Sequence, residues 1–143
     1  MVTVSPTSYF DSSVLLRYVI GHEQSIQNLT PYSKGAVTSA ITAIECLRVL
    51  DRWRITKKIN DERLISARSL CLKILSGLRI IPVDDHVVSM ASQTFPIAMK
   101  SLDAIHLASA LHFQNQSGVK VLLLTHDIKL QMAATAFDMD VFS

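Results

Sequence analysis

The sequence has few of the residues that interrupt or cross-link a chain. Among its 143 residues are four glycines, four prolines and two cysteines, and hydrophobic residues make up 49% of the chain against 18% charged residues. This composition excludes a disulfide-rich scaffold and a disordered chain. Cys46 and Cys71 lack the spacing of a redox or zinc site, so we expect both to be small buried apolar residues.

Long apolar runs are also missing. No segment reaches the ~18 apolar residues that a membrane span requires, and the first residues lack the basic region and apolar run of a signal peptide. We therefore expect a cytoplasmic protein without a membrane segment. The length allows one sizeable core, so we predict a single domain over residues 1–143.

Short apolar strands and helices alternate along the chain. We predict strands at residues 8–11, 36–38, 78–83 and 119–125, and helices at 14–20, 40–53, 61–75, 86–94, 101–111 and 128–137. Pro82 places its strand at a sheet edge or ends it there. Crossover connections between successive strands require parallel pairing, so we predict an α/β protein: three α/β/α layers around a mainly parallel central sheet.

One predicted helix is apolar around most of its surface but carries an acid in its first turn. Ser101 is the expected N-cap, and Asp103 then lies beside unpaired backbone N–H groups, where a carboxylate complements the helix dipole. His106 follows one turn later on a similar face. We expect His106 to form a structural hydrogen bond rather than to belong to a functional site.

Three further acids occupy comparable positions. Asp11 and Asp127 each follow a strand, and Glu45 shares the polar arc of a long helix with Arg48 and Arg52. Taken singly, each has an ordinary role, as a turn or cap residue or as an ion-pair partner of Arg48. Ligands of open α/β sheets bind beyond the carboxyl ends of the strands, and carboxylates gathered there need a cation to balance them. With oxygen donors alone, we expect Mg²⁺ or Mn²⁺, which serve phosphoryl chemistry.

Basic residues are concentrated in one segment. Nine of the fourteen lysines and arginines, but three of the twelve acids, lie between Arg48 and Arg79. Such a strip either forms solvated helix faces or attracts phosphates, and charge alone does not separate these alternatives. If the strip attracts phosphates, its candidate contacts are Arg48, Arg52, Lys57 and Lys58. Apolar residues of the same segment exceed what two basic helices would bury, which favours a homodimer: Ile59, Leu64, Ile65, Leu70 and Leu72.

Four stretches resemble, in order, the motifs of PIN-domain ribonucleases, and most closely those of the VapC-type toxins of prokaryotic toxin–antitoxin modules. They are Tyr9–Leu15, Thr38–Ser39 leading to Ile44–Glu45, Ser101–Ala110, and Leu123–Asp127. The glycine that usually follows the fourth motif is absent from Ala136–Asp140, which leaves the last turn and a final strand open.

This resemblance implies an endoribonuclease that depends on Mg²⁺ or Mn²⁺. Matching positions give a catalytic and metal-binding quartet of Asp11, Glu45, Asp103 and Asp127, with the hydroxyls of Ser12 and Thr125 nearby. The resemblance also implies a homodimer, and a cognate antitoxin protein whose tail enters the acidic groove.

Other small α/β proteins with acids at strand ends fit less well. A receiver domain needs an acidic pair at the end of the first strand, but Asp11 stands between Phe10 and Ser12. An aspartyl-nucleophile phosphatase has a second aspartate where Ser13 stands. The remaining alternative is a non-catalytic PIN-like module that binds RNA or protein, against which the presence of all four acids argues.

Overall fold

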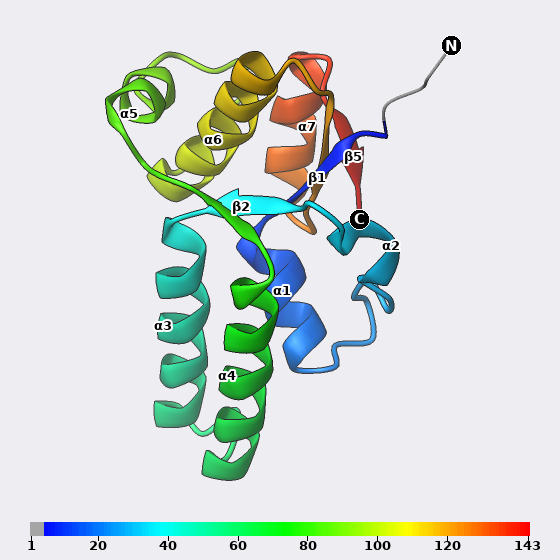
Figure 1. Ribbon diagram of the computed structural model, residues 1–143. Coiled ribbons are helices and arrows are strands. Elements are labelled where there is room, and N and C mark those ends of the chain that lie inside the picture. The colour runs from blue at the N-terminus through cyan, green and yellow to red at the C-terminus, as the bar shows by residue number, and fades with distance from the viewer. Residues whose placement is uncertain (1–4) are drawn as a thin grey trace.

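Five parallel strands form the sheet at the centre of the computed structural model, which describes residues 5–143 (Figure 1). The strand order is β3-β2-β1-β4-β5, and every neighbouring pair is parallel. The strands are β1 (Thr7–Phe10), β2 (Val37–Ser39), β3 (Arg79–Ile81), β4 (Val121–Leu124) and β5 (Asp140–Phe142). The predicted parallel sheet is confirmed, and β3, which Pro82 follows, lies at an edge. Residues 1–4, which belong to the segment used to exclude a signal peptide, lie outside the described residues.

Helices cover both faces of the sheet. Figure 1 shows α1, α3 and α4 on one side, and α5, α6 and α7 on the other. Their bounds are α1 (Ser12–Val19), α2 (Thr30–Ser33), α3 (Ile41–Ile55), α4 (Asp61–Ser76), α5 (Asp85–Ala91), α6 (Ser101–Ser117) and α7 (Ile128–Ala136). The predicted α/β/α arrangement is therefore confirmed. None of these helices, in the part of the chain from residue 5 onward, combines the length and apolar character needed to cross a bilayer.

Alternate residues of the strands supply the two halves of the core. Phe10 and Leu124 pack with α1, α3 and α4, whereas Tyr9 and Leu123 pack with α6 and α7. Cys46 and Cys71 are free thiols buried in the first half, as expected. In the pairing of β1 with β4, Phe10 lies opposite Leu124, so the residues that follow these two strands emerge side by side at the carboxyl edge.

Three local details differ from expectation. Ser101 is not the N-cap of α6: Lys100 holds that position without a side-chain hydrogen bond to the helix. The short helix α2 lies within a polar stretch for which no helix was predicted. The final strand β5 does form. The turn before it has Asp138 at a φ of 58°, so an aspartate occupies the left-handed conformation for which a glycine was expected.

Candidate active site at the carboxyl edge of the sheet

Asp11 is held by hydroxyl groups at the end of β1. The residue is only 3% exposed, and Oδ2 accepts hydrogen bonds from Ser13 Oγ at 2.7 Å and Thr125 Oγ1 at 2.8 Å. Although Asp11 occupies the N-cap position of α1, its carboxylate accepts no capping bond from the helix backbone. A cap role therefore does not explain this buried charge, whereas the two hydroxyl donors explain how it is tolerated.

Glu45 lies in the second turn of α3 with its side chain 14% exposed. Its Oε1 is 2.5 Å from His106 Nε2, and its Oε2 accepts a hydrogen bond from Ser12 Oγ at 3.4 Å. The ion pair with Arg48 that the spacing suggests is absent from the described residues. Glu45 instead turns toward the sheet edge and meets an imidazole.

His106 forms the structural hydrogen bond expected of it, but it forms this bond with a candidate site residue and thereby links the first two acids. Its ring is fully buried, with Nε2 3.5 Å from Asp11 Oδ1 in addition to its contact with Glu45. Burial by itself lowers the pKa of His106, but the hydrogen bond with Glu45 and the charges of Asp11, Glu45 and Asp103 outweigh it, and the pKa is raised overall. A buried histidine one turn after Asp103 in an otherwise apolar helix was the available signal, because such a ring needs polar partners.

Tyr9 was also missed by the sequence reasoning. Its fully buried hydroxyl lies 2.7 Å from His106 Nδ1, and the two rings meet edge to face. Burial, followed by the charge of Asp11, raises the pKa of Tyr9 well above its ordinary value, so its hydroxyl remains protonated. Because an aromatic residue in a buried strand is ordinary core, nothing in the local sequence distinguishes it.

Asp103 and Asp127 line an open pocket of about 450 Å³ together with Ala98, Met99, Lys100 and Lys129. The pKa of Asp103 is raised, first by burial and then by the charges of Asp127, Asp11 and Glu45, although His106 opposes the shift. Asp103 thus lies close enough to the other three acids for their charges to act on it. Asp127 also has the helix-capping role expected of it, because its Oδ1 accepts from Leu130 N at 3.0 Å.

The two hydroxyls expected near the acids both contact them. Thr125, which is fully buried, bonds Asp11 through Oγ1 and accepts a bond from Asp127 N at 3.0 Å with the same atom. Thr125 therefore ties the end of β1 to the start of α7, while Ser12 bonds Glu45. The hydroxyls join elements that are far apart in the sequence.

The acids fit a divalent cation by their chemistry but are not arranged around one. Carboxylate and hydroxyl oxygens are ligands that Mg²⁺ and Mn²⁺ prefer, and the raised pKa of Asp103 indicates negative charge that a cation would balance. Within residues 5–143, however, no group of three or more histidine, cysteine, aspartate or glutamate side chains is placed to hold a metal ion. The convergence of all four acids on one cation stays a prediction.

The candidate RNA-binding residues lie on and after α3. Arg48 and Arg52 follow Glu45 by three and seven positions, so they share its side of the helix, and Lys57 and Lys58 lie in the turn beyond. All four side chains are exposed. Figure 1 shows α3 and α4 extending together away from the sheet, so these positive charges lead outward from the acids.

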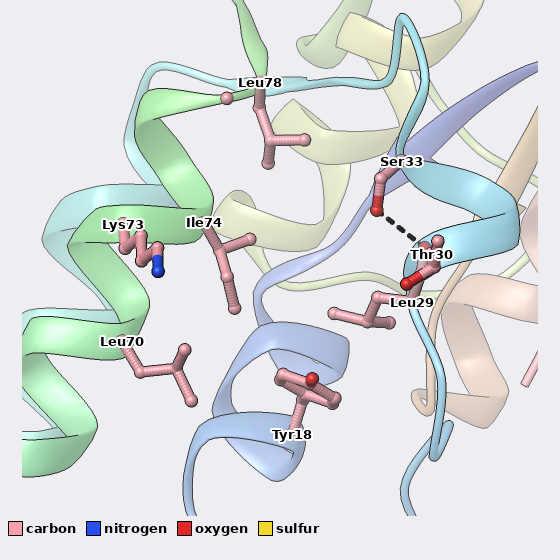
Figure 2. A pocket seen from close by; sticks show the side chains of 9 residues that line it. Tyr18, Leu29, Thr30, Ser33, Leu70, Lys73, Ile74 and Leu78 are labelled. Carbon is pink, nitrogen blue, oxygen red and sulfur yellow. Dashed lines mark hydrogen bonds between the residues drawn. The ribbon is translucent and has the colours of Figure 1, made fainter.

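A second cavity is distinct from the acidic edge. It has a volume of about 330 Å³ and lies between α1, α2 and α4, where Tyr18, Leu29, Ile74 and Leu78 point into a shared space (Figure 2). Ser33 bonds the Leu29 carbonyl at its rim. No carboxylate lines this cavity, so it takes no part in the candidate site.

A family model described as the PIN domain matches residues 8–135. Two similar proteins come from Mycobacterium tuberculosis. Ribonuclease VapC47 (strain CDC 1551 / Oshkosh) is 29% identical over 114 residues, covering 76% of this chain and 77% of its own. Ribonuclease VapC46 (strain ATCC 25618 / H37Rv) is 28% identical over 138 residues, covering 94% and 95%.

Solved structures share the fold. FitAcB from Neisseria gonorrhoeae superposes with a TM-score of 0.66 at 19% identity, over 95% of this chain and 96% of the other. A toxin-antitoxin complex from Klebsiella pneumoniae gives a TM-score of 0.63 at 18% identity, with coverages of 95% and 96%. At this level of identity the two likenesses support the same arrangement of helices and strands.

Proposed function

This chain belongs to the PIN domain family, and on that premise we propose that it is a metal-dependent endoribonuclease that cleaves RNA phosphodiester bonds, as the toxin of a toxin–antitoxin pair. The observation that carries the proposal is the grouping of Asp11, Glu45, Asp103 and Asp127 at one edge of the sheet, within one another's electrostatic field. The ribonuclease names of the two mycobacterial relatives support it.

The four acids are the proposed ligands of Mg²⁺ or Mn²⁺. When bound, such a cation activates a water molecule and balances charge on the scissile phosphate. The protein orients the ligands: Ser13 and Thr125 donate to Asp11, and Ser12 donates to Glu45. These hydrogen bonds fix the orientation of the two carboxylates, whose oxygens are the ligands that Mg²⁺ and Mn²⁺ prefer.

The direct test is cleavage of RNA with and without a divalent cation. Purified protein should cut RNA with Mg²⁺ or Mn²⁺, lose this activity in EDTA, and recover it when the metal is restored. The Asp11→Asn variant, purified in the same way, controls for contaminating nuclease, because it removes one charge from the quartet and should be inactive. Equal cleavage in EDTA, or by Asp11→Asn, would contradict the proposal.

The alternative is a PIN-like module that binds RNA or protein without cutting it. The same preparation separates the two, since a binding module would shift RNA in a mobility assay yet leave it intact at saturating Mn²⁺. Retention of all four acids, with hydroxyl donors on two of them, favours the enzyme.

RNA is proposed to run along α3, where Arg48, Arg52, Lys57 and Lys58 are exposed beyond Glu45. Replacing Lys57 and Lys58 by glutamate should weaken RNA binding. The slope of log K against log salt concentration should become shallower by about 0.7 for each phosphate that the protein no longer binds. Lys34→Glu is the matched control, because Lys34 precedes β2 and lies at the opposite edge of the sheet. An unchanged salt slope would leave the two lysines on a plain solvated face.

The proposed partners are a cognate antitoxin protein and a second copy of the chain, with the single domain of residues 1–143 acting in the cytoplasm. Of the apolar residues that suggested a dimer, Ile65, Leu70 and Leu72 are exposed, whereas Ile59 and Leu64 pack against the core. The homodimer therefore depends on a smaller apolar surface. Sedimentation at micromolar concentration that gives the mass of one 15.9 kDa chain would contradict it.

A further inference from the structure

A buried chain of polar groups lies behind the first two acids and is not part of the acidic quartet. It runs from the Tyr9 hydroxyl through both ring nitrogens of His106 to Glu45, with Asp11 beside it. Tyr9 and His106 are fully buried, so solvent cannot replace either hydrogen-bond partner. Buried polar groups that are completely paired in this way fix side-chain orientation.

We propose that His106, oriented by Tyr9, is a positioning residue that holds Glu45 and Asp11 at the separation and orientation needed to bind the divalent cation. This inference rests on the proposed metal-dependent function. It assigns to Tyr9 and His106 a role in assembling the metal site, and neither residue is itself a ligand in it.

One ring nitrogen of His106 faces both acids. His106 Nε2 is 2.5 Å from Glu45 Oε1 and 3.5 Å from Asp11 Oδ1, and the opposite oxygen of each carboxylate is taken by hydroxyl groups. Within residues 5–143, His106 is the one side chain whose hydrogen bonds and ion pairs reach both acids. Glu45 comes from α3 and Asp11 from the end of β1, so a partner shared by both side chains helps to set their spacing.

Tyr9 influences which ring nitrogen of His106 carries a hydrogen. Carboxylates only accept hydrogen bonds, so Nε2 must donate to hold Glu45. A neutral imidazole has one N–H, and the Tyr9 hydroxyl, 2.7 Å from Nδ1, can donate to that nitrogen and leave the ring hydrogen on Nε2. Tyr9 thus selects the tautomer that the two acids need.

Without His106, little would hold Glu45 in place. Glu45 would keep only the 3.4 Å bond from Ser12, on a side chain with a route to solvent, and its repulsion from Asp11 would turn it outward. Groups that orient metal ligands from behind typically change metal affinity by about 10–100-fold when they are removed. We expect an effect of that size on metal binding, and a smaller one on the rate once metal is saturating.

The test measures Mn²⁺ binding directly, by the electron paramagnetic resonance signal of free Mn²⁺ titrated against purified protein without RNA. Tyr9→Phe keeps the ring and its packing, and should weaken binding about 3–10-fold. His106→Leu removes the donor and should weaken it about 10–100-fold. His106→Gln, which can still donate to Glu45, should recover part of the loss. Tyr18→Phe, at a tyrosine that lines the cavity without carboxylates, should match the wild type.

Two further measurements separate positioning from a general structural role. Cleavage by Tyr9→Phe should need more Mn²⁺ for half-maximal rate, while its rate at saturating Mn²⁺ stays within about threefold of the wild type. In Glu45→Gln, adding Tyr9→Phe should cause a smaller loss of affinity than it does in the wild type, because the contact of His106 with the Glu45 carboxylate is already gone and only its longer contact with Asp11 remains. If His106→Leu fails to fold, the Tyr9→Phe comparison decides alone.

Each outcome is informative. Wild-type Mn²⁺ affinity in folded Tyr9→Phe and His106→Leu would overturn the inference while leaving the proposed nuclease intact. A wild-type protein that binds Mn²⁺ but does not cut RNA would overturn the proposed function, and the affinity comparison would still decide the role of His106. A wild-type protein that binds no Mn²⁺ would overturn both.

Discussion

The four acids divide into two pairs that the fold treats differently. Asp11 and Glu45 are enclosed by donors, three hydroxyls and one imidazole, whereas Asp103 and Asp127 line a pocket that is open to solvent. In the enclosed pair each charge is compensated by short contacts. In the open pair the pKa of Asp103 is raised, which is the sign of a charge that its surroundings do not fully balance.

This difference follows from where each acid stands. Asp11 follows a strand buried in the middle of the sheet. Burying its carboxylate there without hydrogen-bond donors would cost too much free energy, and neighbouring hydroxyls supply those donors. Asp103 lies in the first turn of α6, after an irregular loop that leaves it half-buried. The enclosed pair is therefore held in place before a ligand arrives, while the open pair faces the space where a ligand would enter.

The largest expected effect separates the members of the open pair. Asp103→Asn should reduce RNA cleavage on the order of 100-fold or more. Removing a residue that only orients a metal ligand typically costs about 10–100-fold, and losing a ligand itself should cost at least the upper part of that range. Asp127→Asn should cost less, about tenfold, because Oδ1 of Asp127 already accepts the capping bond from Leu130 N, which leaves this carboxylate less free to bind a cation, and asparagine can keep the cap. Single-turnover rates at saturating Mn²⁺ measure both variants. Equal losses would mean that Asp127 is as much a ligand as Asp103.

The next prediction concerns the donors of the enclosed pair. Thr125→Val removes a hydrogen bond to buried Asp11 and the acceptor for Asp127 N, so the free energy of unfolding should fall by about 1–3 kcal/mol. Thr135→Val is the control: Thr135 is exposed and its hydroxyl bonds only a carbonyl of its own helix, so the change should stay within about 0.5 kcal/mol. Urea unfolding measures both. A Thr125→Val variant as stable as the control would remove the distinction between enclosed and open acids.

Lysines at the rim of the open pocket should have a smaller effect. Lys100 and Lys129 line it beside Asp103 and Asp127, and they are placed to meet phosphate groups rather than to hold the acids. Replacing both by methionine should raise KM for RNA several-fold with little change in kcat, and should flatten the salt dependence of binding by about 0.7 for each phosphate released. Lys120→Met, beside the amino end of β4, is the control. A fall in kcat with KM unchanged would place these lysines in the chemistry instead.

The enclosed pair also marks the limit of prediction from sequence. The order of strands and helices follows from apolar periodicity, and the positions of Asp11 and Asp127 follow from where strands end. Tyr9 could not be assigned to the site in this way, and the position of His106 in an apolar helix indicated a need for polar partners without identifying them. The contacts of both residues depend on how closely α6 approaches β1 and α3, which is a property of tertiary packing. Asp138 shows a related limit, since a turn expected to need glycine is made by an aspartate.

The smallest expected effect is on the free energy of unfolding. Removing a charge from the open pair should raise it, whereas removing one from the enclosed pair should lower it. In metal-free protein at pH 7, Asp103→Asn should raise the free energy of unfolding, because a raised pKa in the folded state means that ionising this carboxylate costs stability. The gain should stay under about 1 kcal/mol, since solvent screens a half-exposed charge. Asp11→Asn should instead lose about 1 kcal/mol: the amide oxygen can still accept from both hydroxyls that donate to Oδ2, but the amide N–H₂ then faces the His106 nitrogen that contacts Glu45, where the carboxylate had an oxygen. Parallel urea unfolding in EDTA measures both changes, and two shifts of the same sign would show that one shared repulsion, rather than the local donors, governs all four acids.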